Sequence, residues 1–163
     1  MSKHLIKTNV NGKAVSFNVD SQERLIDMLR NRMGLTGTKE GCGKGDCGSC
    51  VVVVDGKTVN SCLMLAAQVN GKKVITIEGL GTPEKLHPIQ EAFVEKGAVQ
   101  CGFCIPGMII TAKNFLDQNP NPTRQEIREA ISGNLCRCTG YVKIIEAVRH
   151  TAQIMNENLI SRE

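Results

Sequence analysis

The sequence predicts an α+β protein made of two small domains, a strand-rich first half and a helical second half. Two observations carry this prediction. The apolar residues recur with a period of two before residue 79 and with a period near 3.6 after residue 83. Eight cysteines fall into two sets of four, one set in each half. A length of 163 residues is compatible with one domain or with two small ones, so the division is plausible.

Short strands and glycine turns are expected throughout the first half. Asn11-Gly12 and Asp55-Gly56 are typical of two-residue hairpin turns, in which both central residues take positive φ. A third turn, Asn70-Gly71, precedes one more apolar run. The strands predicted from these signals are residues 4–10, 14–19, 51–54, 57–60 and 73–77.

One helix is expected between the two hairpins. Asp20 and Glu23 predict a capping box at its start, and Gly34 is suited to ending it. A helix over this segment would place four residues near one stripe of its surface, namely Leu25, Met28, Leu29 and Arg32. The glycine-rich segment 39–50 that follows is expected to be a loop.

The second half is predicted to be helical. The segment Gly79-Leu80-Gly81-Thr82-Pro83 is a linker, which divides the chain into domains 1–79 and 80–163. Proline at the first helical position and a Thr123/Glu126 capping box mark helix starts. Helices are expected near residues 88–96, 106–118, 123–132 and 142–156, with a tail at 157–163 that frays.

Composition excludes several classes of protein. Hydrophobic residues make up 41% of the chain and charged residues 22%, and no apolar run approaches 18 residues, so disorder and a membrane span are not expected. The first ten residues lack the apolar core of a secretory signal, which predicts a cytoplasmic protein. In that reducing compartment the eight cysteines are expected to be metal ligands rather than disulfides.

The first cysteine set has the ligand spacing of a plant-type 2Fe-2S cluster. Cys42, Cys47, Cys50 and Cys62 are separated by four, two and eleven residues. The glycines between them let backbone N–H groups turn toward cluster sulfur. The same loop matches the dinucleotide pattern G-x-G-x-x-G, but no strand precedes it and no helix follows, so a nucleotide site is not expected.

The second cysteine set lies in two loops of the helical half. Cys101 and Cys104 form a C-x2-C pair just before a predicted helix, whose N-terminal N–H groups favour an anionic cluster. Cys136 and Cys138 follow after 31 intervening residues. The C-x2-C spacing alone would also fit zinc, whereas C-x-C is less usual for a tetrahedral zinc site.

Both sets together, with Gly133-Asn134-Leu135-Cys136-Arg137-Cys138-Thr139-Gly140-Tyr141, resemble the small iron-sulfur subunit of the molybdenum hydroxylases, the xanthine dehydrogenase family. The resemblance covers about residues 3 to 150, and its specific segments also include 41–50 and 100–108. It implies an N-terminal β-grasp, ferredoxin-like domain and a C-terminal four-helix-bundle domain, each carrying one 2Fe-2S cluster. It also implies that no catalytic residue lies in this chain.

The resemblance further implies an electron relay between a large molybdopterin-binding subunit and an FAD-binding subunit. The helical-domain cluster would be the one nearer the pterin, and Gln100 and the sulfur of Cys138 match positions that hydrogen-bond the pterin. From the sequence alone, the better interpretation of Gln100 is an ordinary loop amide. Arg137 and Asn134 could be hydrogen-bond donors to the cluster, or only loop and cap residues. Two positions depart from the family pattern: Ile105 replaces a threonine expected to cap the helix, and Lys44 replaces an acidic residue and is expected to raise the cluster potential.

Two other functions remain open at this stage. The chain could be a free-standing ferredoxin with two clusters, which would purify alone. It could also be a zinc-stabilised binding module for nucleic acid, although its aromatic residues are only 3% of the chain and its basic residues are scattered. Its formal charge of +4 does not favour nucleic acid, because two oxidised clusters with their thiolates would cancel it.

Overall fold

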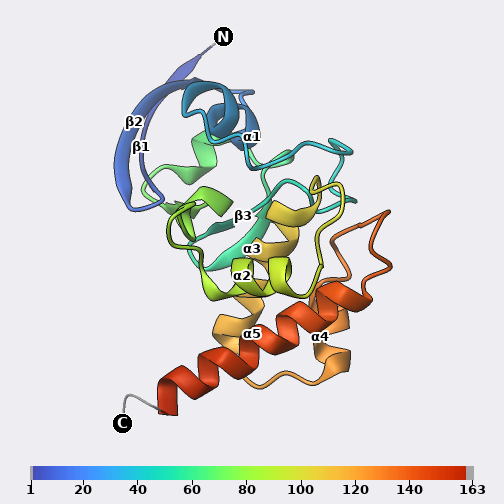
Figure 1. The fold of residues 1–163 in the computed structure, drawn as a ribbon. Coiled ribbons are helices and arrows are strands. Elements are labelled where there is room, and N and C mark those ends of the chain that lie inside the picture. Colours follow the sequence, from blue (N-terminus) through green and yellow to red (C-terminus); the bar gives the residue numbers. More distant parts are fainter. Residues whose placement is uncertain (1, 161–163) are drawn as a thin grey trace.

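Five strands form one mixed sheet in the N-terminal half. The computed structural model describes residues 2–160, except for the side chains of 158–160. The sheet has the order β2-β1-β5-β3-β4, in which β1 and β5 are parallel and the other pairs antiparallel (Figure 1). The strands are β1 (Lys3–Val10), β2 (Lys13–Asp20), β3 (Val51–Val54), β4 (Lys57–Asn60) and β5 (Lys73–Ile75).

Both predicted hairpin turns are confirmed. Asn11 and Gly12 have φ values of 52° and 82°, and Asp55 and Gly56 have values of 47° and 79°. Two successive positive φ values define the turn type whose twist matches that of antiparallel strands. The register of β3 and β4 is therefore fixed by the turn, and this register carries two of the cysteines to the same end of the hairpin.

The helix after the first hairpin starts later than predicted. α1 spans Leu25–Asp27 and continues as a π-helical turn over Met28–Arg32. The predicted capping box at Asp20 is wrong, because β2 extends through Asp20 and the residue that precedes the helix is Arg24. The Glu23 carboxylate does accept a hydrogen bond from the Asp20 N–H at 3.3 Å, but inside the turn that ends the strand. The apolar residues of the predicted stripe are fully buried against the sheet: Leu25, Met28 and Leu29.

The last strand is two residues shorter than predicted. β5 ends at Ile75 because the side chain of Asn11 binds Thr76, accepting from its backbone N–H at 2.9 Å and donating to its hydroxyl at 2.9 Å. These bonds occupy the groups that would otherwise continue the ladder. Two 3-10 turns flank this strand along the chain, at Ala66–Val69 and Ile77–Gly79.

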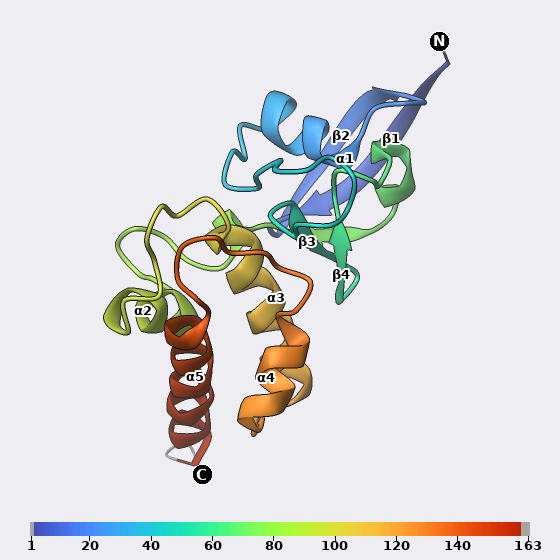
Figure 2. The ribbon, with the colours of Figure 1, turned by 90° about the vertical axis from the view of Figure 1, so that its right-hand side faces the viewer.

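The described part of the second half contains four helices, which Figure 2 labels α2 to α5. Two of their starts have the predicted caps: His87 precedes Pro88 at the first helix, and Thr123 exchanges hydrogen bonds with Glu126 at the third. The fourth helix continues four residues beyond its predicted end, so fraying from residue 157 is not observed as far as 160, and residues 161–163 lie outside the described part. The helices are α2 (Pro88–Glu95), α3 (Ile105–Gln118), α4 (Arg124–Ala130) and α5 (Val142–Ile160).

Each half has its own apolar core, and α3 lies against the sheet. One core joins α2, α3, α4 and α5, and the other joins the sheet to α1. The contacts of α3 with β3 and β4 bring the start of α3 close to the loop that precedes β3 (Figure 2). The predicted α+β class, with a mixed sheet followed by helices, is confirmed, and both cysteine-bearing regions lie where the two halves meet.

Candidate metal centres

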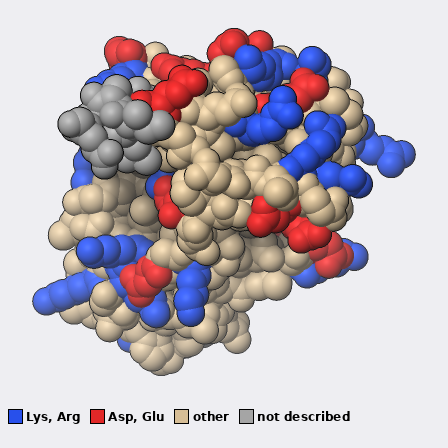
Figure 3. All heavy atoms as spheres, turned by 90° about the horizontal axis from the view of Figure 1, so that it is seen from below, with Lys and Arg blue, Asp and Glu red and all other residues tan. Residues whose placement is uncertain are grey.

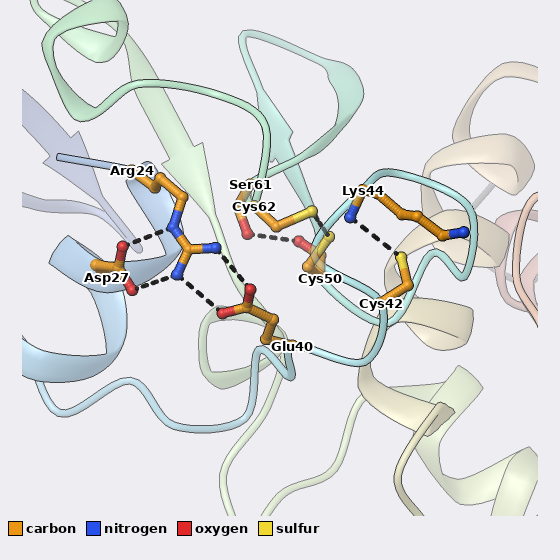
Figure 4. A network of polar contacts seen from close by, with 8 residues as sticks. All are labelled: Arg24, Asp27, Glu40, Cys42, Lys44, Cys50, Ser61 and Cys62. Atoms are coloured by element: carbon orange, nitrogen blue, oxygen red, sulfur yellow. Dashed lines mark hydrogen bonds and ion pairs between the residues drawn. The ribbon is translucent and has the colours of Figure 1, made fainter. Parts of the chain in front are cut away.

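Cys50 and Cys62 are brought together by the closure of the β3–β4 hairpin. Cys50 directly precedes β3, and Cys62 lies two residues after β4. The backbone N–H and the hydroxyl of Ser61 both donate to the carbonyl oxygen of Cys50, at 3.3 and 2.7 Å. The two thiols are buried, and their sulfur atoms lie 3.3 Å apart (Figure 4). The hairpin therefore presents two thiols side by side.

Cys42 and Cys47 form the second pair of this set, in the glycine-rich loop. Their side chains contact each other, and the backbone N–H of Lys44 donates to the Cys42 sulfur at 3.5 Å. Gly43 and Gly45 have φ values of 65° and 88°, which lets the loop curl around the sulfur. Hydrogen bonds from backbone N–H groups, first that of Lys44 and then that of Cys47, lower the pKa of Cys42 to about 6. Cys42 is thus poised as a thiolate, the form that binds metal.

Burial opposes ionisation of one thiol in each cysteine set. It raises the pKa of Cys50 to about 12 in the first set and the pKa of Cys104 to about 12 in the second. Such a thiol keeps its proton at neutral pH until a metal displaces it. Metal binding at either set is therefore expected to release protons.

The glycine-rich loop is anchored at its start by a guanidinium. Arg24 binds Asp27 through Nε at 2.7 Å and Nη2 at 2.9 Å, and Glu40 through Nη1 at 2.6 Å and Nη2 at 3.0 Å (Figure 4). These two carboxylates hold the pKa of Arg24 above its usual value. Glu40 lies two residues before Cys42, so this bidentate pairing fixes the loop next to α1. Sequence reasoning missed this contact, because nothing local links Arg24 to Glu40.

The second cysteine set combines two connections of the helical half. Cys101 and Cys104 lie between α2 and α3, and Cys136 and Cys138 lie between α4 and α5. The sulfurs of Cys138 and Cys101 are 3.6 Å apart, and the thiol of Cys104 hydrogen-bonds that of Cys136. Cys101 and Cys138 are exposed, whereas Cys104 is buried. The four thiols again form two pairs.

A tyrosine holds the C-x-C loop in place. The Cys136 backbone N–H donates to the Tyr141 hydroxyl at 2.8 Å, and that hydroxyl donates to the Asn134 carbonyl at 3.1 Å. The Thr139 backbone N–H in turn donates to the Cys136 sulfur at 3.5 Å. Asn134 was a candidate donor to the cluster, but its side-chain amide donates instead to the Gly48 carbonyl at 3.0 Å. Arg137, the other candidate, is exposed.

The arrangement in pairs fits a binuclear cluster better than a single ion. Two thiolates on one tetrahedral metal with bonds of about 2.3 Å lie about 3.8 Å apart. The sulfur–sulfur distances of 3.3 and 3.6 Å in the two pairs are close to this value. Among residues 2–160, no group of three or more His, Cys, Asp or Glu side chains is placed to hold one metal ion. A zinc site would need four thiols around one point, whereas a 2Fe-2S cluster needs two thiols on each of two irons.

The glycine-rich loop of the first cysteine set contacts the C-x-C loop of the second set. The backbone N–H of Leu135 donates to the carbonyl oxygen of Cys47 at 2.9 Å. Leu135 directly precedes Cys136 in the chain. This hydrogen bond therefore joins Cys47 of the first set to the residue next to Cys136 of the second set. Sequence reasoning treated the sets as belonging to separate domains and did not predict this contact.

Comparison with known proteins identifies both halves. Residues 8–75 match the 2Fe-2S iron-sulfur cluster binding domain family, and residues 76–149 match the [2Fe-2S] binding domain family. The nicotinate dehydrogenase small FeS subunit of Eubacterium barkeri is 51% identical over 94% of this chain and 98% of its own length. The chain belongs to the small iron-sulfur subunits of the molybdenum hydroxylases. The resemblance inferred from the cysteine motifs is therefore confirmed.

Solved structures of oxidoreductases contain this fold. In quinoline 2-oxidoreductase from Pseudomonas putida 86, a chain with 46% identity superposes with a TM-score of 0.91 and covers 95% of this chain and 97% of its own. In the aldehyde oxidoreductase of Desulfovibrio gigas, the match has 44% identity and a TM-score of 0.92, and it covers 95% of this chain but 17% of the longer one. The predicted role as the electron-transfer subunit of an oxidoreductase and the prediction of two 2Fe-2S domains are both confirmed.

The structure shows the surroundings of the two residues that depart from the family pattern, Ile105 and Lys44. Ile105 is the first residue of α3 and packs in the helical core, and the capping position belongs to Cys104, so the expected loss of a hydroxyl cap is wrong. Lys44 does lie in the first loop, where its ammonium pairs with the Asp46 carboxylate at 3.2 Å. Gln100 is exposed beside Cys101.

Proposed function

We propose that the chain relays single electrons from a large molybdopterin-binding subunit to an FAD-binding subunit through two 2Fe-2S clusters. The observation that carries this proposal is the arrangement of eight thiols as two groups of two pairs, each group in a domain that matches a 2Fe-2S family. Each cluster, when bound, accepts one electron and passes it on. The proposed ligands are Cys42, Cys47, Cys50 and Cys62 for one cluster and Cys101, Cys104, Cys136 and Cys138 for the other.

The contact between the loops supports transfer within the chain. From the Cys47 sulfur, covalent bonds lead to its carbonyl oxygen, a 2.9 Å hydrogen bond leads to the Leu135 N–H, and further covalent bonds lead to the Cys136 sulfur. This route connects the two proposed ligand sets without a gap filled by solvent. The chain's own contribution is thus to hold two one-electron carriers at a fixed separation.

The helical-domain cluster is proposed to face the pterin. Cys101 and Cys138 are exposed, so this cluster would lie at the surface. Large apolar side chains within four residues of them along the chain are also exposed, a feature typical of protein interfaces: Val99, Phe103, Leu135 and Val142. Gln100, the neighbour of Cys101 in the chain, is exposed as well, and its amide and the Cys138 sulfur are proposed to hydrogen-bond the pterin of the large subunit.

The finer fold and location are proposed on the same grounds. We assign residues 1–79 to a β-grasp, ferredoxin-like domain and residues 80–163 to a four-helix-bundle domain. Support comes from the mixed sheet around α1 and from the second core, which α2, α3, α4 and α5 share. None of the described helices is long and apolar enough to cross a membrane. We propose a cytoplasmic location, because a reducing compartment keeps cysteine thiols available as metal ligands.

The two alternatives have less support. A nucleic-acid module would gather basic residues, but Lys and Arg intermix with Asp and Glu on the face in Figure 3. A free-standing ferredoxin would need no partner, whereas the relative in Eubacterium barkeri is named a small subunit. Co-elution of the native protein with larger chains that carry molybdopterin and FAD would support the subunit role, and elution of the holoprotein alone would contradict it.

The iron content of the chain and the paramagnetic signals of its reduced form test the cluster assignment. Anaerobically reconstituted chain is expected to bind about four irons and, when reduced, to give two distinguishable paramagnetic signals. Iron well below four per chain, or a colourless protein that binds zinc instead, would contradict the assignment.

A further inference from the structure

Gly48 is enclosed by two separate elements of the helical half. A Cβ atom built on Gly48 would overlap the carbonyl oxygen of Gly133 and would lie 2.6 Å from Nδ2 of Asn134. A Cβ atom built on Gly107, in α3, would overlap the carbonyl oxygen of Gly48 and would lie 3.1 Å from the Cα of Ser49. The backbone at Gly48 therefore has no room for one methyl group on either side.

The atoms in the way at Gly107 are backbone atoms, which cannot rotate aside as a flexible side chain could. Hydrogen bonds join the first loop to the other enclosing element, the segment of Asn134 and Leu135. The buried Asn134 amide donates to the Gly48 carbonyl at 3.0 Å, and the Leu135 N–H donates to the Cys47 carbonyl at 2.9 Å. Steric contact thus sets how closely the loops approach, and hydrogen bonds prevent them from separating.

Every residue of this contact lies next to a proposed cluster ligand. Gly48 follows Cys47, Gly107 lies three residues after Cys104 in the first turn of α3, and Asn134 lies two residues before Cys136. Glycine inside a helix is less favourable than alanine, because its backbone loses more conformational freedom on folding. Gly107 does not have a positive φ that would require glycine. What its missing side chain does allow is the close approach of α3 to Gly48.

We propose that Gly48, Gly107 and Asn134 are positioning residues that set the separation between the two clusters, and with it the rate at which electrons pass between them. This inference rests on the proposed function, since it requires a cluster at each cysteine set. Alanine at 107 would have to move α3 from the first loop by about 1 Å to restore van der Waals distance. Cys104 would move with α3, and electronic and magnetic coupling between two centres weakens steeply with separation.

The test compares Gly107→Ala with Gly133→Ala in the full chain. A Cβ atom at Gly133 would meet nothing within 4 Å, so this variant adds a methyl group next to Asn134 in the second loop without displacing either loop. Each protein is reconstituted anaerobically, its iron is counted, and it is fully reduced. The spin-spin splitting between the two reduced clusters is then measured by paramagnetic resonance, together with the signal of each cluster when the other is oxidised.

We expect four irons in all three proteins, a smaller splitting in Gly107→Ala, and the wild-type splitting in Gly133→Ala. The signals of the isolated clusters should be unchanged, which separates a change in distance from damage to a cluster. Unchanged splitting in a four-iron Gly107→Ala protein would overturn the proposal. Wild-type chain with fewer than four irons would instead overturn the proposed function.

A second variant decides the question if Gly107→Ala does not retain its iron. Asn134→Ala removes the hydrogen bond to the Gly48 carbonyl without adding bulk, so the loops are expected to separate and the splitting to decrease. A four-iron Asn134→Ala protein with the wild-type splitting would overturn the role of the contact.

Discussion

The Tyr141 hydroxyl accepts the backbone N–H of Cys136 at 2.8 Å, so a side chain at the start of α5 fixes a proposed cluster ligand five residues earlier. The same hydroxyl donates to the Asn134 carbonyl at 3.1 Å. Tyr141 itself has a φ of 67°, which is unusual for a residue with a large side chain. The backbone of Tyr141 is thus held in an unfavourable conformation, in which its hydroxyl makes both of these hydrogen bonds to the loop.

Tyr141→Phe should therefore destabilise the second cluster selectively. The substitution keeps the ring but leaves a partly buried N–H and a carbonyl oxygen without their partner, which costs about 1–2 kcal/mol. Iron release to a chelator should become faster for half of the iron, and thermal unfolding of the helical half should occur at a lower temperature. Ser132→Ala removes an exposed hydroxyl nearby and serves as the control. Equal iron release from Tyr141→Phe and wild type would contradict the role of this hydroxyl.

Cys47→Ala should remove two irons and leave the other two. The second loop contacts Cys47 through its backbone carbonyl, which alanine retains, so loss of the first cluster need not unfold the second half. Iron analysis and the paramagnetic signal of the reduced variant check this, and Cys136→Ala is the matched variant in the other set. Loss of all four irons from Cys47→Ala would show that the two clusters assemble as one unit.

Local signals explain what could be predicted from the sequence. The hairpins at Asn11-Gly12 and Asp55-Gly56 depend on the φ preferences of two adjacent residues, and the Thr123 cap depends on a carboxylate three residues away. The cysteine spacings were equally informative, because the proposed ligands of each set lie in one or two short loops. The capping box at Asp20 failed because pairing with β1 extended the strand over it.

Contacts between distant segments could not be predicted. The sequence does not show that Gly107 lies against Gly48, so nothing distinguishes it from any other glycine in a helix. The pairing of Arg24 with Glu40 spans 16 residues, and no local pattern predicts it. Both contacts depend on how α3 and the glycine-rich loop pack against the sheet. The sequence could therefore indicate which side chains we propose as iron ligands, but not which residues we propose to set the separation of the two sites.

Lys44 and Asp46 should have opposite effects on the potential of the first cluster. A unit charge about 10 Å away in water contributes about 0.4 kcal/mol, or about 20 mV for one electron. Lys44→Gln is expected to lower the potential by about this amount, and Asp46→Asn to raise it, because the reduced cluster carries one more negative charge. The double variant should return near the wild-type value, since the two charges are paired at 3.2 Å.

A redox titration followed through the signal that Cys47→Ala lacks would measure these shifts. The potential of the second cluster provides the internal control, because Lys44 and Asp46 both lie in the first loop. Equal shifts of both clusters would mean that the charge does not act locally.

Acid should destabilise the helical half through His87. This residue precedes α2, and its Nδ1 accepts the Ile89 N–H at 3.3 Å. Burial, and then the positive charge of Lys113, lower the pKa of His87, although the carboxylates of Asp117 and Glu91 oppose the shift. Because the folded pKa lies below the ordinary value of about 6.5, the unfolded chain binds the proton first. The free energy of unfolding should be constant above that pH, fall as the pH drops toward the folded pKa, and level off below it.

His87→Asn isolates this contribution, because asparagine can also accept a hydrogen bond at a helix start but does not titrate. Chemical unfolding at pH 7.5 and at pH 5.5 should show a smaller loss of stability in His87→Asn than in wild type. His4→Asn, in the exposed part of β1, controls for the removal of a histidine and should keep the wild-type loss. Acid affects the clusters of all three proteins alike, so the difference between variants carries the result. The same loss in His87→Asn as in wild type would mean that the acid sensitivity of the helical half arises elsewhere.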